Sequence, residues 1–165
     1  MRHLQKKSPL NLDKIAARYT VVAPYLRDNY GSSYDSDSYS LAIAPSGSGK
    51  EVYGEFDFGA FEGYLRSTSI DTAARTISFH WRGRETGEGE STFGPNNRLR
   101  ITFLDDKTFE GEAEGDVFER CNLTGRYDAE RSRNKVFQKA VPGWKYQYES
   151  LDEDNYERER VARWH

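Results

Sequence analysis

The stretch TISFHWRGR, residues 76–84, carries the clearest structural signal in the chain. Ile77, Phe79 and Trp81 stand at alternate positions, with polar or charged residues between them. Successive side chains of a β-strand point to opposite faces of the sheet, so this alternation predicts a half-buried strand. We expect the Trp81 face to point into the core.

The same two-residue period recurs from about residue 18 to residue 127. The connections between these runs are mostly short and rich in turn-forming residues. Strands joined in this way must be antiparallel, because a parallel pair needs a crossover of a dozen residues or more. The further strand candidates are 18–25, 39–45, 51–58, 61–70, 98–104, 107–115 and 117–127. Eight or nine such strands predict either a closed barrel or a sandwich of two sheets.

Glycines inside the predicted strands favour the barrel. Glycine normally weakens a strand, but a small barrel needs strongly bent strands, and glycine supplies the bend. The glycines in question are Gly54, Gly63, Gly83, Gly111 and Gly125. We therefore predict an all-β fold: a small antiparallel up-and-down β-barrel of about eight strands, with a C-terminal helical tail and the sandwich as the alternative.

The predicted organisation has three parts. Residues 1–17 form a basic N-terminal tail with a short helical turn near its end, and residues 18–127 form the barrel. Residues 128–165 form a C-terminal extension with a helix at about 150–164, where Ser150 and Glu153 have the spacing of a capping box. The Asp-, Ser- and Gly-rich segment 27–38 predicts a surface loop.

Composition excludes several classes of protein. A net charge of -3 over 165 residues predicts neither a nucleic-acid partner nor a membrane partner. The N-terminus lacks the apolar core of a secretory signal, and no run approaches the roughly 18 apolar residues of a membrane-spanning helix. We therefore expect a cytoplasmic protein. The single cysteine, Cys121, excludes an intramolecular disulfide and is expected to be a small buried apolar residue.

Glycine-kinked strands written F-x-G, W-x-G and G-x-Y, as in 61–63, 81–83 and 125–127, resemble those of the calycin-type barrels, the lipocalins and avidins. The resemblance spans about residues 18–127 and implies the barrel fold. The lipocalin G-x-W and disulfides and the avidin tryptophan set are absent, so no binding residue is carried over. WRGRETGEGE (81–90) is also similar to uncharacterised fungal open reading frames, which implies a fungal source and no activity.

Three functional classes follow from such a barrel. An eight-stranded barrel can hold one small ligand, which favours a protein that binds an apolar or aromatic molecule in its interior. The same cavity could serve a cofactor-free isomerase or cyclase, and a filled barrel would suit a structural or protein-interaction module. The sequence leaves open whether the protein is an enzyme, and its oligomeric state. The candidate ligand-binding residues are Tyr53, Phe56, Tyr64, Phe79, Trp81, Arg82 and Phe103.

The polar residues of 80–90 are the candidates for chemistry. His80, Arg82 and Glu88 could transfer protons or hold a carbonyl or anionic group. The two strand registers exclude each other, and we favour the one with Trp81 inward and Arg82 near a rim. The alternative is a solvent-facing hairpin whose charges form ion pairs.

The stretch SGSGK, 46–50, ends in Gly-Lys as a phosphate-binding loop does. Such a loop requires an earlier glycine where Ala44 stands, and a Ser or Thr where Glu51 stands. No helix pattern follows Lys50, so we predict a hairpin loop without a nucleotide. The sequence has no clustered His or Cys motif, so no metal and no cofactor are expected.

Overall fold

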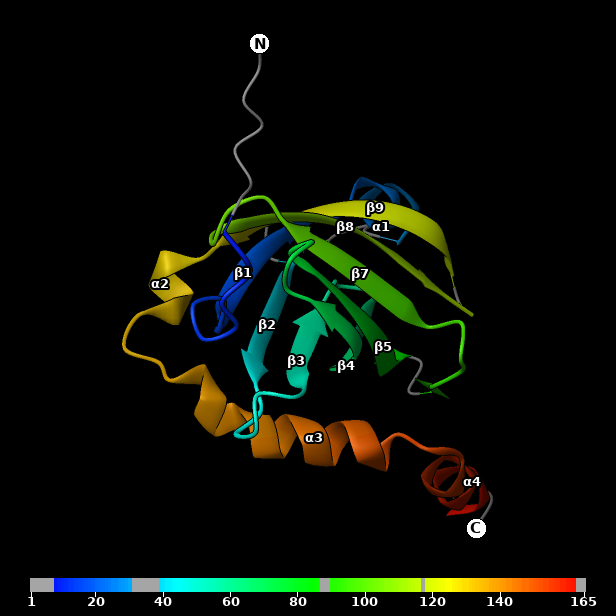
Figure 1. The fold of residues 1–165 in the computed structure, drawn as a ribbon. Helices are drawn as coiled ribbons and strands as arrows, with labels where there is room; N and C mark the ends of the chain where they lie inside the picture. The colour runs from blue at the N-terminus through cyan, green and yellow to red at the C-terminus, as the bar shows by residue number, and fades with distance from the viewer. Residues whose placement is uncertain (1–7, 31–38, 87–89, 117, 163–165) are drawn as a thin grey trace.

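The computed structural model describes residues 8–30, 39–86, 90–116 and 118–162. Eight strands form one closed antiparallel barrel, in which β1 pairs with β9 and β4 with β5 (Figure 1). The strands are β1 (Ala17–Val22), β2 (Ser40–Pro45), β3 (Val52–Asp57), β4 (Phe61–Asp71), β5 (Thr76–Glu85), β7 (Arg98–Phe103), β8 (Thr108–Gly115) and β9 (Phe118–Tyr127). A two-residue strand, β6 (Ser91–Thr92), pairs with the end of β5. The predicted up-and-down barrel is confirmed.

Aromatic rings fill much of the barrel interior. The ring of Tyr19 packs edge-on against Phe103 and Phe109, with centroids 5.9 Å and 5.3 Å away. Trp81 points inward as expected, is 2% exposed, and packs against Phe56 at 5.6 Å. Its indole N–H donates to the backbone carbonyl of Glu114 at 2.9 Å. Large rings thus build a core in a chain with few aliphatic residues.

Two of the strand glycines allow β4 and β5 to approach closely. Gly63 and Gly83 are directly opposite each other in the register. A Cβ added to Gly63 would lie 2.2 Å from the carbonyl oxygen of Arg82 and 2.6 Å from the Cα of Gly83. These contacts involve only backbone atoms, so no side-chain rotation could relieve them.

A helix follows β1 where the sequence predicted more strand and then a loop. Helix α1 runs over Pro24–Tyr30 and buries Leu26. Proline suits the first turn of a helix, because the N–H groups there have no intrahelical partner. The prediction was therefore wrong for residues 24–30, while residues 31–38 of the expected loop lie outside the described residues.

The C-terminal extension is more helical than predicted. It contains α2 (Ala129–Ser132), the 3₁₀ helix η2 (Phe137–Ala140), α3 (Val141–Ser150) and α4 (Glu153–Ala162). Helix α4 lies within the predicted helix, but α3 was not predicted because Pro142-Gly143 suggested a break. Proline is instead accommodated in the first turn of α3.

The predicted capping box at Ser150 is wrong. The Asp152 carboxylate accepts the N–H of Asn155 at 2.8 Å, so Asp152 caps α4. The Ser150 hydroxyl instead donates to the carbonyl of Tyr146, one turn back in α3.

Near the N-terminus, the expected helical turn is a single hydrogen-bonded turn, in which the Lys14 N–H donates to the carbonyl of Asn11.

Helix α3 packs against the outside of the barrel over β3, β4 and β5; it is the orange helix in Figure 1. Together with η2, which packs on β2, this helix forms a second apolar cluster, separate from the barrel interior, made of Ala42, Ala44, Tyr53, Phe137, Val141 and Trp144. The barrel wall therefore has an inner and an outer apolar side at this place. Within the described part of the chain, no helix is long and apolar enough to cross a membrane.

Candidate functional site

The seven predicted ligand-binding residues lie on both sides of the barrel wall. Phe56, Phe79, Trp81 and Phe103 belong to the interior cluster. Tyr53 belongs to the outer cluster, Tyr64 packs against it, and Arg82 lies under α3. Neighbouring side chains of a strand point to opposite faces, so these seven residues do not line the barrel interior together.

The interior of the barrel is filled by side chains. Its remaining void measures about 10 Å³ and is lined by Phe56, Phe58, Leu65, Trp81, Leu99 and Ala113. A single water molecule needs about 10–15 Å³ of such space. The interior in this structure therefore has no room for an organic ligand.

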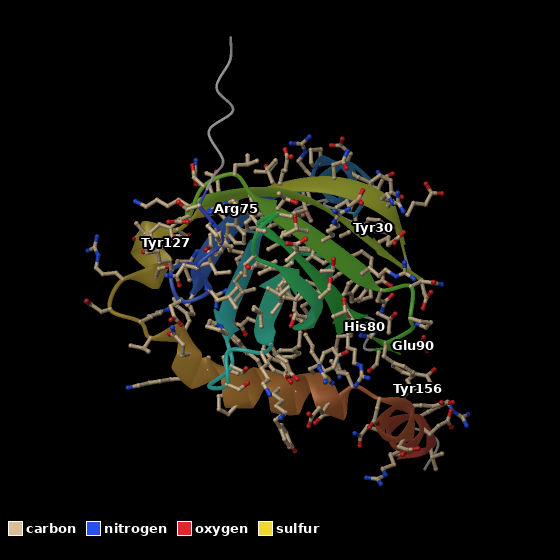
Figure 2. All side chains as sticks on the ribbon, viewed as in Figure 1. Tyr30, Arg75, His80, Glu90, Tyr127 and Tyr156 are labelled. Atoms are coloured by element: carbon tan, nitrogen blue, oxygen red, sulfur yellow. The ribbon has the colours of Figure 1, made fainter. Side chains whose placement is uncertain are left out.

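His80 lies on the outer face of β5, on the side of the barrel toward α3 (Figure 2). Both of its ring nitrogens are hydrogen-bonded. Nε2 is 2.8 Å from the carbonyl oxygen of Gly94, and Nδ1 is 2.7 Å from the hydroxyl of Tyr148. Because a carbonyl can only accept, the neutral ring carries its proton on Nε2 and accepts the Tyr148 O–H at Nδ1. Burial lowers the pKa of His80, and the neighbouring Arg82 adds to this effect.

Arg82 also contacts Tyr148. Its guanidinium carbon lies 4.3 Å from the centre of the Tyr148 ring, and Nη1 donates to the Tyr148 carbonyl at 3.1 Å. His80 and Arg82 therefore meet at α3 and not in the barrel interior. Glu88, the third candidate for chemistry, lies outside the described residues.

A large cleft separates the barrel wall from the C-terminal extension. This wall cleft has a volume of about 770 Å³ and is reached by residues of β1 to β5 on one side and of α2 and α3 on the other. Its lining comprises Arg18, Ser40, Glu55, Phe56, Asp57, Glu62, Gly63, Tyr64, Gly83, Arg84, Arg131, Lys135, Gln147 and Leu151. Of the predicted site residues, Phe56 and Tyr64 reach this cleft.

Two of the cations in the wall cleft already have carboxylate partners. Arg18 forms an ion pair with Glu55 and donates to the hydroxyl of Ser40 at 3.1 Å. Arg131 pairs with Asp128, whose carboxylate also accepts the backbone N–H of Arg131 and caps α2. That N–H is the main reason why the pKa of Asp128 is lowered.

Four other charged groups of the cleft make no ion pair with any residue that the structure describes. They are Arg84, Lys135, Asp57 and Glu62. Asp57, Glu62 and Arg84 are consecutive neighbours across β3, β4 and β5. Tyr64 lies two residues after Glu62 on β4 and opposite Glu55 on β3. Burial, together with the carboxylates of Glu55 and Glu62, raises the pKa of Tyr64. The cleft thus offers both hydrogen-bond donors and acceptors to a bound molecule.

Most of the cleft was not predicted. Arg84 belongs to the polar stretch that the sequence marked, but Arg18, Lys135 and Gln147 come from distant segments without any motif. Within the described residues, no group of His, Cys, Asp and Glu is placed to hold a metal ion. Burial raises the pKa of the Cys121 thiol to about 11, so this buried cysteine stays a neutral thiol.

The SGSGK stretch forms the hairpin between β2 and β3. The Ser46 N–H donates to the Glu51 carbonyl at 2.8 Å, and Gly49 has a φ of 71° that favours glycine. The chain continues from Lys50 directly into β3, without a helix N-terminus that could bind phosphate.

We expect Lys50→Ala to change the free energy of unfolding by no more than about 0.5 kcal/mol, because the side chain is at an exposed turn. Adding ATP and Mg²⁺ should leave the melting temperature unchanged in a thermal scan, since only a ligand of the native state stabilises it. A rise in melting temperature that Lys50→Ala abolishes would contradict the hairpin assignment.

No protein-family model matches this chain, and no curated protein matches it. What this chain shares with calycin-type barrels is therefore the eight-stranded antiparallel barrel and nothing finer. The resemblance to fungal open reading frames has no support.

Proposed function

We propose that this protein is a small-molecule-binding β-barrel whose ligand occupies the wall cleft. The observation that carries the proposal is that four charged groups without an ion pair among the described residues face a cleft of about 770 Å³, whereas the interior void is about 10 Å³. Surface hollows of about 780 Å³ and 730 Å³ lie elsewhere on the barrel, and the C-terminal extension lines neither of them. Small-molecule sites commonly measure about 300–1,000 Å³. The barrel then acts as a rigid wall, and the C-terminal extension forms the second wall.

The proposed ligand is polar, in place of the apolar ligand expected from the sequence. Arg84 and Lys135 can donate hydrogen bonds, while Asp57 and Glu62 can accept them. Arg84 is the best anchor, because it is half-buried and its planar guanidinium can hold two oxygen atoms at once. A molecule that carries several hydroxyl groups, or a carboxylate together with hydroxyl groups, would satisfy both sets.

The test is nuclear magnetic resonance of the ¹⁵N-labelled full chain with a set of monosaccharides, amino acids and hydroxy acids. We expect saturable shifts at the backbone amides of Glu55, Tyr64 and Arg84. Arg84→Ala should weaken the binding about tenfold or more, because a hydrogen bond to a charged group is lost. Its effect on the free energy of unfolding should stay within about 0.5 kcal/mol.

Arg100→Ala is the matched control. Arg100 is an exposed arginine on the outer face of β7, lies outside the wall cleft, and also has no ion pair among the described side chains. The control should bind like the wild type. Saturable shifts that map to the barrel interior, or equal losses in both variants, would contradict the placement of the ligand.

A filled interior also favours a second function, that of a structural or protein-interaction module. Of the exposed large apolar side chains among the described residues, Tyr146 of α3 is the most exposed, at 69%, and would be a contact residue of such a module. If no member of the set shifts the cleft amides, this reading becomes the better one. The isomerase alternative lacks comparable support, because both ring nitrogens of His80 are already bonded, to Gly94 and Tyr148.

A further inference from the structure

Four polar residues form one row across the barrel side of the wall cleft. Ser40, Asp57, Glu62 and Arg84 are consecutive partners in the register of β2, β3, β4 and β5, and all four line the cleft. Paired strands lie about 4.8 Å apart, so each group is one strand spacing from the next. The order along the row is hydroxyl, carboxylate, carboxylate and guanidinium.

The two carboxylates of this row face each other without a cation from the chain. Asp57 and Glu62 are direct cross-strand partners, and like charges at such positions repel each other. Asp57 Oδ1 accepts the backbone N–H of Gly59 at 2.9 Å, which is a neutral donor. Among the described residues, neither carboxylate forms an ion pair. A cationic group of a ligand would relieve the repulsion.

The unpaired charges of the cleft add up to zero. Arg84 and Lys135 are positive, and Asp57 and Glu62 are negative. A ligand with only a carboxylate would neutralise the first two alone, and a ligand with only an ammonium group the last two. Hydroxyl groups can hydrogen-bond to all four but neutralise none. Electrostatic complementarity therefore favours a ligand that carries both charges.

The row also sets how far apart the ligand's two charges stand. Glu62 and Arg84 are on adjacent strands, so the groups that they bind must be close together. In an α-amino acid a single carbon atom joins the ammonium group to the carboxylate, whereas in a peptide many bonds separate them. Arg84 can hold both carboxylate oxygens with its planar guanidinium, and an ammonium group has three donors for Glu62 and Asp57.

We propose that the ligand of the wall cleft is a free α-amino acid, with its carboxylate on Arg84 and its ammonium group on Glu62 and Asp57. The inference rests on the proposed function, because it names the ligand class of the same cleft. Arg84 is half-buried and gives the carboxylate a fixed anchor, while the two acidic side chains are exposed and can turn toward the ammonium group.

The test uses two matched sets of compounds in the nuclear magnetic resonance titration of the full chain. One set is L-serine, glycerate and ethanolamine, and the other is L-phenylalanine, phenyllactate and phenethylamine. Within each set, a hydroxyl replaces the ammonium group in the second compound, and the third lacks the carboxylate. In at least one set we expect the amino acid to bind about tenfold or more tightly than both analogues, since each analogue loses a charge-assisted hydrogen bond.

Two variants assign the charged groups. Glu62→Gln should weaken amino acid binding about tenfold and leave the hydroxy acid of the same set unaffected. Arg84→Gln should weaken amino acid binding as much and leave the amine unaffected. Glu110→Gln is the matched control for Glu62, because Glu110 is an exposed carboxylate on β8, outside the cleft, and makes no ion pair among the described side chains. It should bind every compound like the wild type.

The outcomes separate this inference from the proposed function. Hydroxy acids that bind as tightly as their amino acids, or monosaccharides that alone shift the cleft amides, would overturn the α-amino acid and leave a small-molecule site standing. Amino acid binding that Glu62→Gln does not weaken would overturn it as well. A cleft that binds none of the compounds would refute both.

Discussion

Trp81→Ala is expected to lower the free energy of unfolding by about 3–5 kcal/mol, the usual cost of truncating a large aromatic residue in a core. The indole packs against Phe56 and borders a void of only about 10 Å³, so its removal would leave a cavity that the closed barrel cannot easily collapse. The backbone carbonyl of Glu114 would also lose the indole N–H that donates to it.

Chemical denaturation monitored by circular dichroism measures this loss. Trp144→Ala is the matched comparison, since Trp144 is also buried but lies outside the barrel, between α3 and the wall. We expect it to loosen α3 while the strands keep their protection from hydrogen exchange. A cost below about 1 kcal/mol for Trp81→Ala would be typical of a surface position and would contradict the inward register.

Gly63→Ala is expected to cost about 3 kcal/mol, at the upper end of what overpacking does. The new methyl group would lie 2.2 Å from the carbonyl oxygen of Arg82, and its three nearest atoms all belong to the β5 backbone. Backbone atoms can move only if β4 and β5 separate, which weakens their pairing. Thermal or chemical unfolding would show the loss.

Gly47→Ala is the control for this substitution. Gly47 lies in the β2–β3 hairpin, and nothing stands within 4 Å of a Cβ added there. We expect its free energy of unfolding to stay within about 0.5 kcal/mol of the wild type. Similar effects of both alanines would mean that close approach of the strands is not what Gly63 provides.

The strand pattern was predictable because it is local. Ile77, Phe79 and Trp81 needed only the two-residue period to be assigned to the interior, and the interior cluster contains all three. The glycines of β4 and β5 likewise indicated a closed barrel before any pairing was known. Their exact role, the contact of Gly63 with Gly83, required the register.

Helix α3 was not predicted although its apolar residues have helical spacing, because a neighbouring Pro-Gly pair suggested a break. Val141, Trp144 and Tyr148 have the spacing of one helix face, and all three are buried. Pro142-Gly143 outweighed this pattern, although proline is well tolerated in a first helical turn. The start of α1 was missed for a different reason, because the two-residue alternation of 18–25 continued through Pro24 to Tyr25.

The sequence alone determines which residues of each strand share a face, because that depends only on the alternation of neighbouring side chains. It does not determine whether the barrel is hollow, since the void that remains depends on how side chains from all eight strands fit together. The wall cleft depends still more on tertiary structure. Arg18, Arg84 and Lys135 meet only because the barrel closes and the C-terminal extension returns across its wall. No local pattern encodes contacts between segments so distant in the chain, so the candidate site became visible only in the folded protein.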